Sequence, residues 1–161
     1  MIILLMGVAG SGKTTVGRQL AADLGWAFAD ADDFHPPANV AKMTAGQPLD
    51  DPDRAPWLAA IRAYIEARHA RNESAVITCS ALKERYRRII VTDPAFVKLV
   101  HLHGPRELLW ARISGRQNHF MKPAMLDSQL AALEPPAGVL TVDIAPPPAE
   151  VAATIRRALS L

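Results

Sequence analysis

Short runs of apolar residues alternate along the chain with longer stretches in which apolar residues recur every three or four positions. None of the short runs alternates between apolar and polar residues, which is typical of parallel strands covered by helices on both faces. Strands are expected at Ile2–Met6, Ala27–Asp30, Ala75–Cys79, Val97–Leu102 and Leu140–Ile144. The pattern therefore predicts an α/β fold with a parallel sheet.

The stretches between these runs predict amphipathic helices. A helix is expected from Gly12 to Leu24, because Gly25 can adopt the left-handed conformation that ends a helix. Similar patterns cover residues 82–90 and 151–159. The clearest apolar stripe consists of Trp57, Leu58, Ile61, Tyr64 and Ile65, which share one face of a helix.

Two polar stretches interrupt this alternation. Residues 35–56 contain five prolines, and residues 114–123 are polar and basic. Long irregular segments inside a compact domain are usually binding loops or lids. We interpret residues 35–56 as an irregular substrate-recognition segment and residues 114–123 as a lid.

Composition narrows the class of protein. A length of 161 residues fits a single domain, residues 1–161, without a repeat or a shift in composition. Half of the residues are hydrophobic and 21% are charged, which excludes a disordered chain. The net charge of +2 gives no electrostatic reason to expect a nucleic acid or a membrane as partner. Cys79 is the single cysteine, which excludes an intramolecular disulfide. We expect a cytoplasmic protein.

Residues 7–14 fit the phosphate-binding pattern G-x-x-x-x-G-K-S/T, directly between a predicted strand and a predicted helix. Glycines let consecutive backbone N–H groups approach phosphate oxygens, and the positive end of the helix dipole adds to their attraction. The lysine reaches the β- and γ-phosphates, and the threonine hydroxyl can bind Mg²⁺. The predicted ATP-binding residues of this loop are Gly7, Val8, Ala9, Gly10, Ser11, Gly12, Lys13, Thr14 and Thr15.

This motif alone does not identify the phosphate acceptor. A GTPase would need a guanine-reading motif such as N-K-x-D, which is absent from the sequence. A large motor ATPase would have a longer chain and a strand that ends in acidic residues, whereas the third predicted strand ends at Cys79 and Ser80. A small kinase that acts on a metabolite remains.

Three carboxylates, Asp30, Asp32 and Asp33, follow the second predicted strand. Ligands of open α/β sheets bind at the carboxyl ends of the strands, beside the phosphate-binding loop. One carboxylate can orient Mg²⁺, and a second can accept the proton of the attacking hydroxyl. Asp30 and Asp32 are favoured for these roles, and the residues alone leave open which of the three is the base.

Several cationic and imidazole side chains are candidate substrate contacts. Lys83 and Arg87 are four residues apart, so both can face one side of a helix and bind an anionic substrate. Arg54 can bind a carboxylate or a hydroxyl, or instead pair with the aspartates that precede it. His35 is a candidate hydroxyl contact.

Arg112 and Arg116 are also four residues apart, at the start of the predicted lid. The planar guanidinium group suits the oxygens of a phosphoryl group in transfer and stabilises the charge that develops there. We predict that both bind ATP. Lys13, Asp32 and Arg116 are the predicted catalytic residues.

Longer strings of the sequence resemble the gluconokinase family. They are GVAGSGKT, DADDFHPPANVAKMTAGQPLDDPDRAPWL, CSALKERYR and RISGRQNHFMKPAMLDSQLAALEPP, in this order along nearly the whole chain. The resemblance implies transfer of a phosphoryl group from ATP to the 6-hydroxyl of D-gluconate, which yields 6-phosphogluconate. It also implies five parallel strands in the order 2-3-1-4-5, a mobile lid and a homodimer.

A more distant resemblance to the shikimate kinases assigns Asp30 to Mg²⁺ and Asp32 to the substrate hydroxyl. The gluconokinases often have glycine between these carboxylates, where this chain has Ala31. Two alternatives stay open at this point: a kinase for shikimate or another sugar acid, and a non-catalytic ATP-binding module. The second would not need the acceptor-site residues.

Overall fold

A five-stranded parallel sheet forms the centre of the molecule, with its strands in the order β2-β3-β1-β4-β5. The computed structural model describes residues 1–115 and 123–161. The strands are β1 (Ile2–Met6), β2 (Ala27–Asp30), β3 (Ala75–Thr78), β4 (Val97–His103) and β5 (Leu140–Asp143). The predicted fold class and strand order are therefore confirmed, and each strand lies within one residue of its expected bounds.

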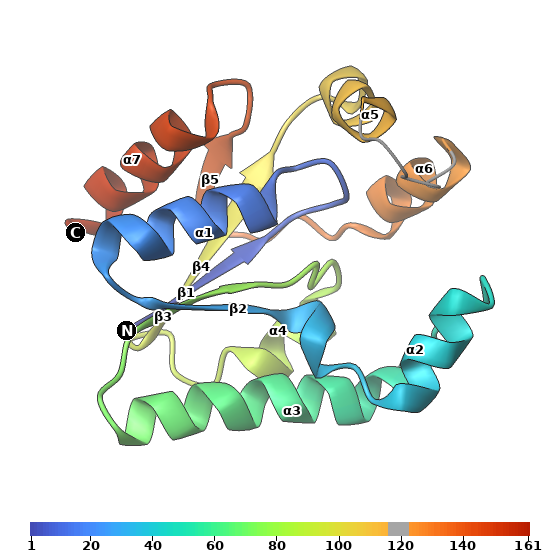
Figure 1. Ribbon diagram of the computed structural model, residues 1–161, viewed down its shortest axis with the longest axis horizontal. Coiled ribbons are helices and arrows are strands. Elements are labelled where there is room, and N and C mark those ends of the chain that lie inside the picture. The colour runs from blue at the N-terminus through green and yellow to red at the C-terminus, as the bar shows by residue number, and fades with distance from the viewer. Residues whose placement is uncertain (116–122) are drawn as a thin grey trace.

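Helices cover both faces of this sheet (Figure 1). The helices α1 and α7 pack on one face, and α3 and α4 pack on the other. The described helices are α1 (Lys13–Leu24), the short 3-10 helix η1 (Ala31–Phe34), α2 (Pro37–Thr44), α3 (Asp51–Ala70), α4 (Glu84–Ile90), α5 (Arg106–Ser114), α6 (Pro123–Ala132) and α7 (Pro148–Leu159). None of them is long and apolar enough to cross a membrane.

The central strand β1 contributes to two hydrophobic cores at once. Ile3 and Leu5 belong to the core beneath α1 and α7, whereas Ile2, Leu4 and Met6 belong to the core above α3 and α4. All five side chains are fully buried. This double burial explains why the strand is apolar at every position.

Helix α1 lies unusually close to the sheet at Gly17. A Cβ atom at this position would lie 2.8 Å from Cγ2 of Thr78 and 2.9 Å from Cε2 of Phe28. Because real Cβ atoms do not approach other atoms so closely, only glycine allows this spacing between α1 and the strands β2 and β3.

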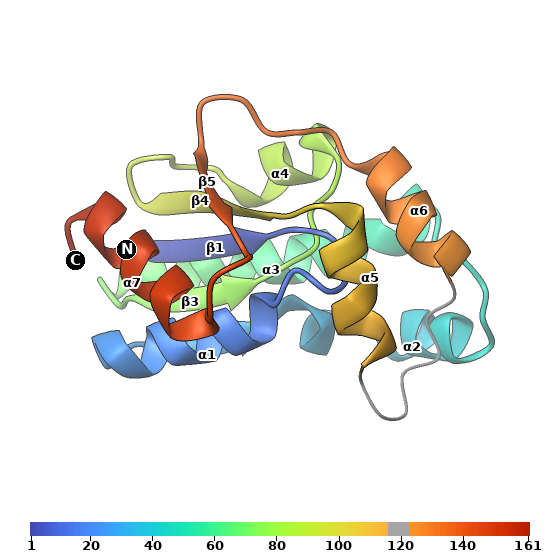
Figure 2. The same ribbon diagram turned by 90° about the horizontal axis from the view of Figure 1, so that it is seen from above.

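The segment 35–56 is not irregular as expected, because it contains α2 and the first turn of α3. A reciprocal capping box begins α3: the side chain of Asp50 accepts from the backbone N–H of Asp53, and the side chain of Asp53 accepts from that of Asp50. Prolines and acidic residues, which suggested a loop, are also favoured in the first turn of a helix. The segment lies with α5 and α6 at the end of the sheet where β1 ends (Figure 2).

The predicted lid, residues 114–123, joins α5 to α6. Its first residue, Ser114, ends α5, and its last, Pro123, begins α6. Residues 116–122, and Arg116 with them, lie outside the described residues.

Candidate active site

The phosphate-binding loop, residues 7–12, connects β1 to α1. Gly10 and Gly12 have φ angles of 80° and 83°, which favour glycine. A Cβ atom on Gly10 would also lie 2.6 Å from the backbone oxygen of Leu109. The ammonium group of Lys13 donates to the backbone oxygen of Val8 at 3.1 Å, which places it against the loop.

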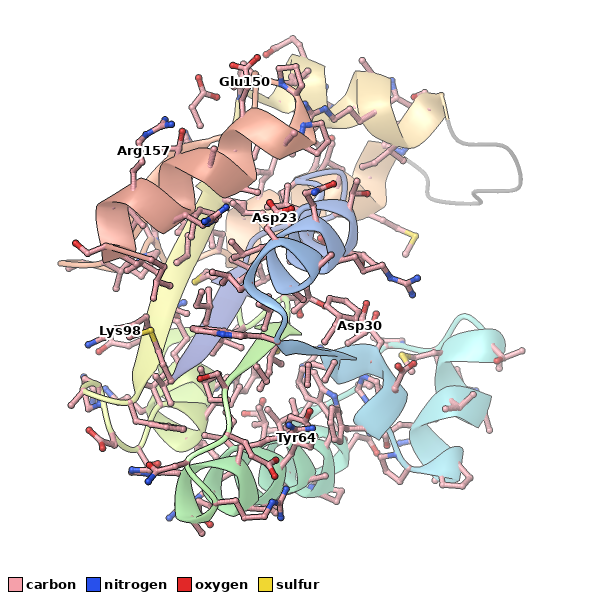
Figure 3. All side chains as sticks on the ribbon, turned by 60° about the vertical axis from the view of Figure 1, so that its left-hand side comes forward. Asp23, Asp30, Tyr64, Lys98, Glu150 and Arg157 are labelled. Carbon is pink, nitrogen blue, oxygen red and sulfur yellow. The ribbon has the colours of Figure 1, made fainter. Side chains whose placement is uncertain are left out.

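A hydroxyl and a carboxylate meet beside this loop. Oγ1 of Thr14 donates to Oδ2 of Asp30 at 3.1 Å, and Oδ1 of Asp30 accepts from the backbone N–H of Asp32 at 3.2 Å. Asp30 lies at the end of β2, between α1 and the segment that leads to α2 (Figure 3). Within the described ranges no cluster of three or more His, Cys, Asp or Glu side chains could hold a metal ion. The oxygen pair of Thr14 and Asp30 fits Mg²⁺, which uses few protein carboxylates together with phosphates and water.

Three cavities surround these groups. The first, the α1–α7 cavity, has a volume of about 260 Å³ and is lined by Gly10, Ser11, Gly12, Thr15, Val16, Arg112, Ile144, Pro146, Pro148 and Val151. The second, the P-loop cavity, has a volume of about 350 Å³ and is lined by Ala9, Gly10, Gly12, Lys13, Thr14, Asp30, Asp32, Cys79, Ser80 and Gln129.

The third, the α2–α6 cavity, is the largest of the three, with a volume of about 670 Å³. Its polar lining includes Asp32, His35, Gln47, Arg54, Ser80, Ser128 and Gln129. Asp32, Ser80 and Gln129 line both this cavity and the P-loop cavity. These three residues therefore mark the junction between a phosphate-binding loop and a polar cavity.

Asp32 is set apart from an ordinary surface carboxylate by its surroundings. Although Asp32 is exposed as a residue, the protein atoms around its carboxyl group desolvate it and raise its pKa above the ordinary value of 3.8, and the charge of Asp30 raises the pKa further. The charges of His35 and Lys13 oppose this rise. A carboxylate with a raised pKa is a stronger base, so its position and basicity suit proton abstraction.

The ring of His35 is held against the indole of Trp57. Its ring stacks on Trp57, with ring centroids 4.5 Å apart and an angle of 10° between the planes. Nε1 of Trp57 donates to the backbone oxygen of Ala31 at 2.6 Å, which fixes the indole. Burial lowers the pKa of His35 below the ordinary value of 6.5 and so favours the neutral ring.

Arg54 does not pair with the neighbouring aspartates. Its Nη1 atom lies 3.2 Å from the hydroxyl oxygen of Tyr86, and its guanidinium group lies over the ring of Tyr86. Asp53 binds Lys42 at 2.7 Å instead, and Asp51 binds Arg85 at 2.8 Å. Arg54 thus contributes a guanidinium to the lining of the α2–α6 cavity, and its role as a substrate contact stays a prediction.

The structure does not bring Arg87 to this cavity. The side chain is buried and donates to the backbone oxygens of Ala81, Leu82 and Glu134 at 3.0, 2.9 and 2.9 Å. Arg87 and Lys83 do not share a helix face as expected, because α4 begins at Glu84 and the backbone of Lys83 is extended. Lys83 lies close enough to Asp51 to help lower the pKa of that carboxyl group.

Arg112 lies in the last turn of α5 and donates to the backbone oxygen of Ile144. It lines the α1–α7 cavity next to the phosphate-binding loop, and its role in binding ATP stays a prediction. Ser80 and Gln129 are functional candidates that the sequence analysis missed. Ser80 lies two residues after the end of β3, and this position near a strand end could have indicated it. Gln129 has no such local signal.

A phosphate-binding loop lies next to a large polar cavity, and Asp32, a carboxylate with a raised pKa, lies between them. This arrangement is that of a P-loop kinase that acts on a small molecule. Residues 9–134 match the family model of shikimate kinase. The chain is 47% identical to a gluconokinase of Gluconobacter oxydans over 134 residues, which cover 83% of this chain and 75% of the relative.

Two solved structures are also similar. A sugar kinase from Janibacter sp. is 41% identical, with a TM-score of 0.88 over 99% of this chain and 94% of that one. A gluconokinase from Sinorhizobium meliloti is 41% identical, with a TM-score of 0.82 over 98% of this chain and 94% of that one. The chain belongs to the gluconokinase family.

Proposed function

We propose that this protein transfers the γ-phosphoryl group of ATP to the 6-hydroxyl of D-gluconate, giving ADP and 6-phospho-D-gluconate. The observation that carries the proposal is the junction at Asp32, a residue that lines both the P-loop cavity and the α2–α6 cavity. Membership of the gluconokinase family supports the identity of the acceptor.

The nucleotide is assigned to the loop side of the junction. Its phosphates lie along residues 7–15, with Mg²⁺ held by Thr14 and Asp30 to neutralise their charge. The adenosine occupies the α1–α7 cavity, whose walls include Ile144 and Pro146. Arg112 supports the phosphates from α5, and Arg116 keeps its predicted role as a phosphoryl contact.

Gluconate is assigned to the α2–α6 cavity. A polyol with a carboxylate needs one cation and several hydrogen-bonding partners, and the cavity offers Arg54 together with His35 and Ser80. Lys83 stays a predicted contact at the α4 end. With Arg54 on the carboxylate, the terminal hydroxyl points toward Asp32.

In the phosphoryl transfer, the side chains of this chain accept a proton and stabilise charge. As the hydroxyl oxygen forms its bond to the γ-phosphorus, its proton passes to the carboxylate of Asp32. The bond between the γ-phosphorus and the bridging oxygen breaks, and its electron pair leaves with ADP. Lys13 stabilises the charge on the phosphoryl oxygens. Closure of residues 114–123 excludes water, which would compete with gluconate as acceptor.

We further propose that residues 1–161 form one domain, that residues 35–56 recognise the acceptor, and that the enzyme works as a cytoplasmic homodimer. The two cores on either face of β1 support a single folding unit. The use of ATP and the buried, unpaired thiol of Cys79 fit a cytoplasmic location.

The test is an ADP-release assay with Mg²⁺ and ATP, run with D-gluconate, its near isomers, shikimate and no acceptor. We expect rapid turnover with gluconate alone, and mass spectrometry of the product should locate the phosphate on the 6-oxygen. Rapid turnover with shikimate instead would overturn the acceptor. Nucleotide binding without turnover on any acceptor would overturn the kinase assignment.

A further inference from the structure

The side chain of Gln129 connects helix α6 to the phosphate-binding loop. Its Oε1 atom accepts from the backbone N–H of Ala9 at 2.7 Å. The segment after α6 is anchored too, because the side chain of Glu134 accepts from the backbone N–H of Glu84 at 2.6 Å. The C-terminal half of α6 is thus attached to the phosphate-binding loop, and the segment that follows it is attached to the start of α4.

The bond to Ala9 decides how the carboxamide of Gln129 is oriented. Because Oε1 faces the loop, the Nε2 group points away from Ala9, and it carries two N–H donors. Gln129 lines both cavities, together with Asp32 and Ser80. In the proposed reaction, the phosphoryl group crosses this junction as it passes from ATP to the acceptor.

We propose that Gln129 is a catalytic residue of the phosphoryl transfer: its Nε2 group donates a hydrogen bond to an oxygen of the phosphoryl group in transit, while its Oε1 atom holds the loop. The inference rests on the proposed kinase function and adds a residue that contacts the reacting group. A donor aimed at charge that develops in the transition state contributes about 10²–10³-fold to the rate.

Two variants separate this role from a purely structural one. Gln129→Glu keeps an acceptor for the N–H of Ala9 but replaces the donor with an oxygen, whereas Gln129→Met removes both. If the side chain served only to hold α6 on the loop, Gln129→Glu would keep the wild-type kcat and Gln129→Met would lose it. We expect kcat to fall on the order of 10²-fold in both variants.

The pH dependence gives a second readout. A protonated glutamate can donate, so the ratio of the Gln129→Glu activity to the wild-type activity should rise as the pH falls. The control is Asp127→Asn on the same helix, an exposed residue that binds Arg106 and lines none of the three cavities. It should keep the wild-type kcat.

The experiment measures kcat with saturating gluconate and Mg²⁺-ATP, together with the melting temperature of each variant. A Gln129→Glu enzyme within threefold of the wild-type kcat would overturn the role of Gln129 and leave the kinase function standing. A wild-type protein without gluconate turnover would overturn the kinase function itself. The two failures are therefore distinguishable.

Discussion

The amide of Asn39 fixes the tautomer of the His35 ring. Nδ2 of Asn39 donates to the backbone oxygen of Asp53 at 2.8 Å, and the same nitrogen lies 3.2 Å from Nδ1 of His35. An amide nitrogen cannot accept, so Nδ1 must be the acceptor and the proton of the neutral ring must be on Nε2. His35, which lines the α2–α6 cavity, therefore has its N–H donor on Nε2.

Asn39→Asp should reverse this arrangement. A carboxylate accepts a proton from Nδ1 and stabilises the charged ring, so the pKa of His35 should rise from its lowered value. The ¹⁵N shifts of the imidazole, followed through a pH titration, report both the tautomer and the pKa. At a pH where the ring is neutral, its proton should be on Nδ1 and Nε2 should no longer donate, so we expect the KM for gluconate to rise about 10-fold, the equivalent of one hydrogen bond.

Lys42→Met provides the control for Asn39→Asp. Lys42 binds the carboxylate of Asp53 but does not contact His35. Its loss should leave the imidazole shifts and the KM for gluconate unchanged. Unchanged shifts in Asn39→Asp would contradict the tautomer assignment.

Asp32→Asn should lower kcat by about 10²–10⁴-fold, because the variant cannot accept the proton of the hydroxyl. The KM for ATP should change little. Asp33→Asn is the matched comparison, since both aspartates are exposed but Asp33 lines none of the three cavities. Equal losses in the two variants would be inconsistent with Asp32 as the base.

The raised pKa of Asp32 also has consequences for pH dependence. The acidic limb of kcat/KM should have its midpoint above 3.8, the ordinary value for this carboxyl group. Because the folded state raises this pKa, the contribution of Asp32 to stability is present below pH 3.8 and is lost as the pH rises through the raised value. Asp32→Asn should therefore melt at a higher temperature than wild type at neutral pH, and the difference should shrink in acid. A lower melting temperature at neutral pH would contradict the raised pKa of Asp32.

Arg54→Lys should raise the KM for gluconate by about 10- to 100-fold, because a lysine lacks the planar fork that binds a carboxylate through two hydrogen bonds. The KM for ATP should stay the same. Arg62→Lys is the control on the same helix, because Arg62 is exposed and binds Glu66. A gluconate KM that does not respond to Arg54→Lys would place the carboxylate elsewhere.

Arg87→Met should destabilise the fold rather than weaken substrate binding. Three backbone oxygens would lose their donor, which lowers the free energy of unfolding by about 2–4 kcal/mol. Urea denaturation measures this change, and Arg88→Met, an exposed neighbour that binds Glu84, should cost far less. A stable Arg87→Met enzyme with a raised KM for gluconate would restore the role of substrate contact.

Local patterns account for what could be predicted from the sequence. The strands and the phosphate-binding loop are continuous segments with their own signals, so their positions are confirmed within one residue. The strand order could be expected only from the family resemblance, because no local pattern says which strands are paired. The long helix α3 was predicted from its apolar stripe, but its first turn was mistaken for a loop.

The site was predicted less completely because its contacts link distant segments. Gln129 meets Ala9 across 120 positions, and no spacing rule connects them. Arg87 was expected to face the substrate because the helix was assumed to begin earlier than Glu84. The roles of Asp30, Asp32 and Arg54 depend on ligands and stay predictions.

Because Gly17 has no side chain, helix α1 packs close to the sheet, and the reaction depends on this distance. Helix α1 carries Lys13 and Thr14 at one end, while β2 carries Asp30, and Gly17 lets the two approach. A methyl group there would wedge α1 away from the sheet and move the phosphates relative to the acceptor, although it would touch neither. The distance over which the phosphoryl group travels thus depends on how closely α1 packs against β2 and β3 in the interior of the protein.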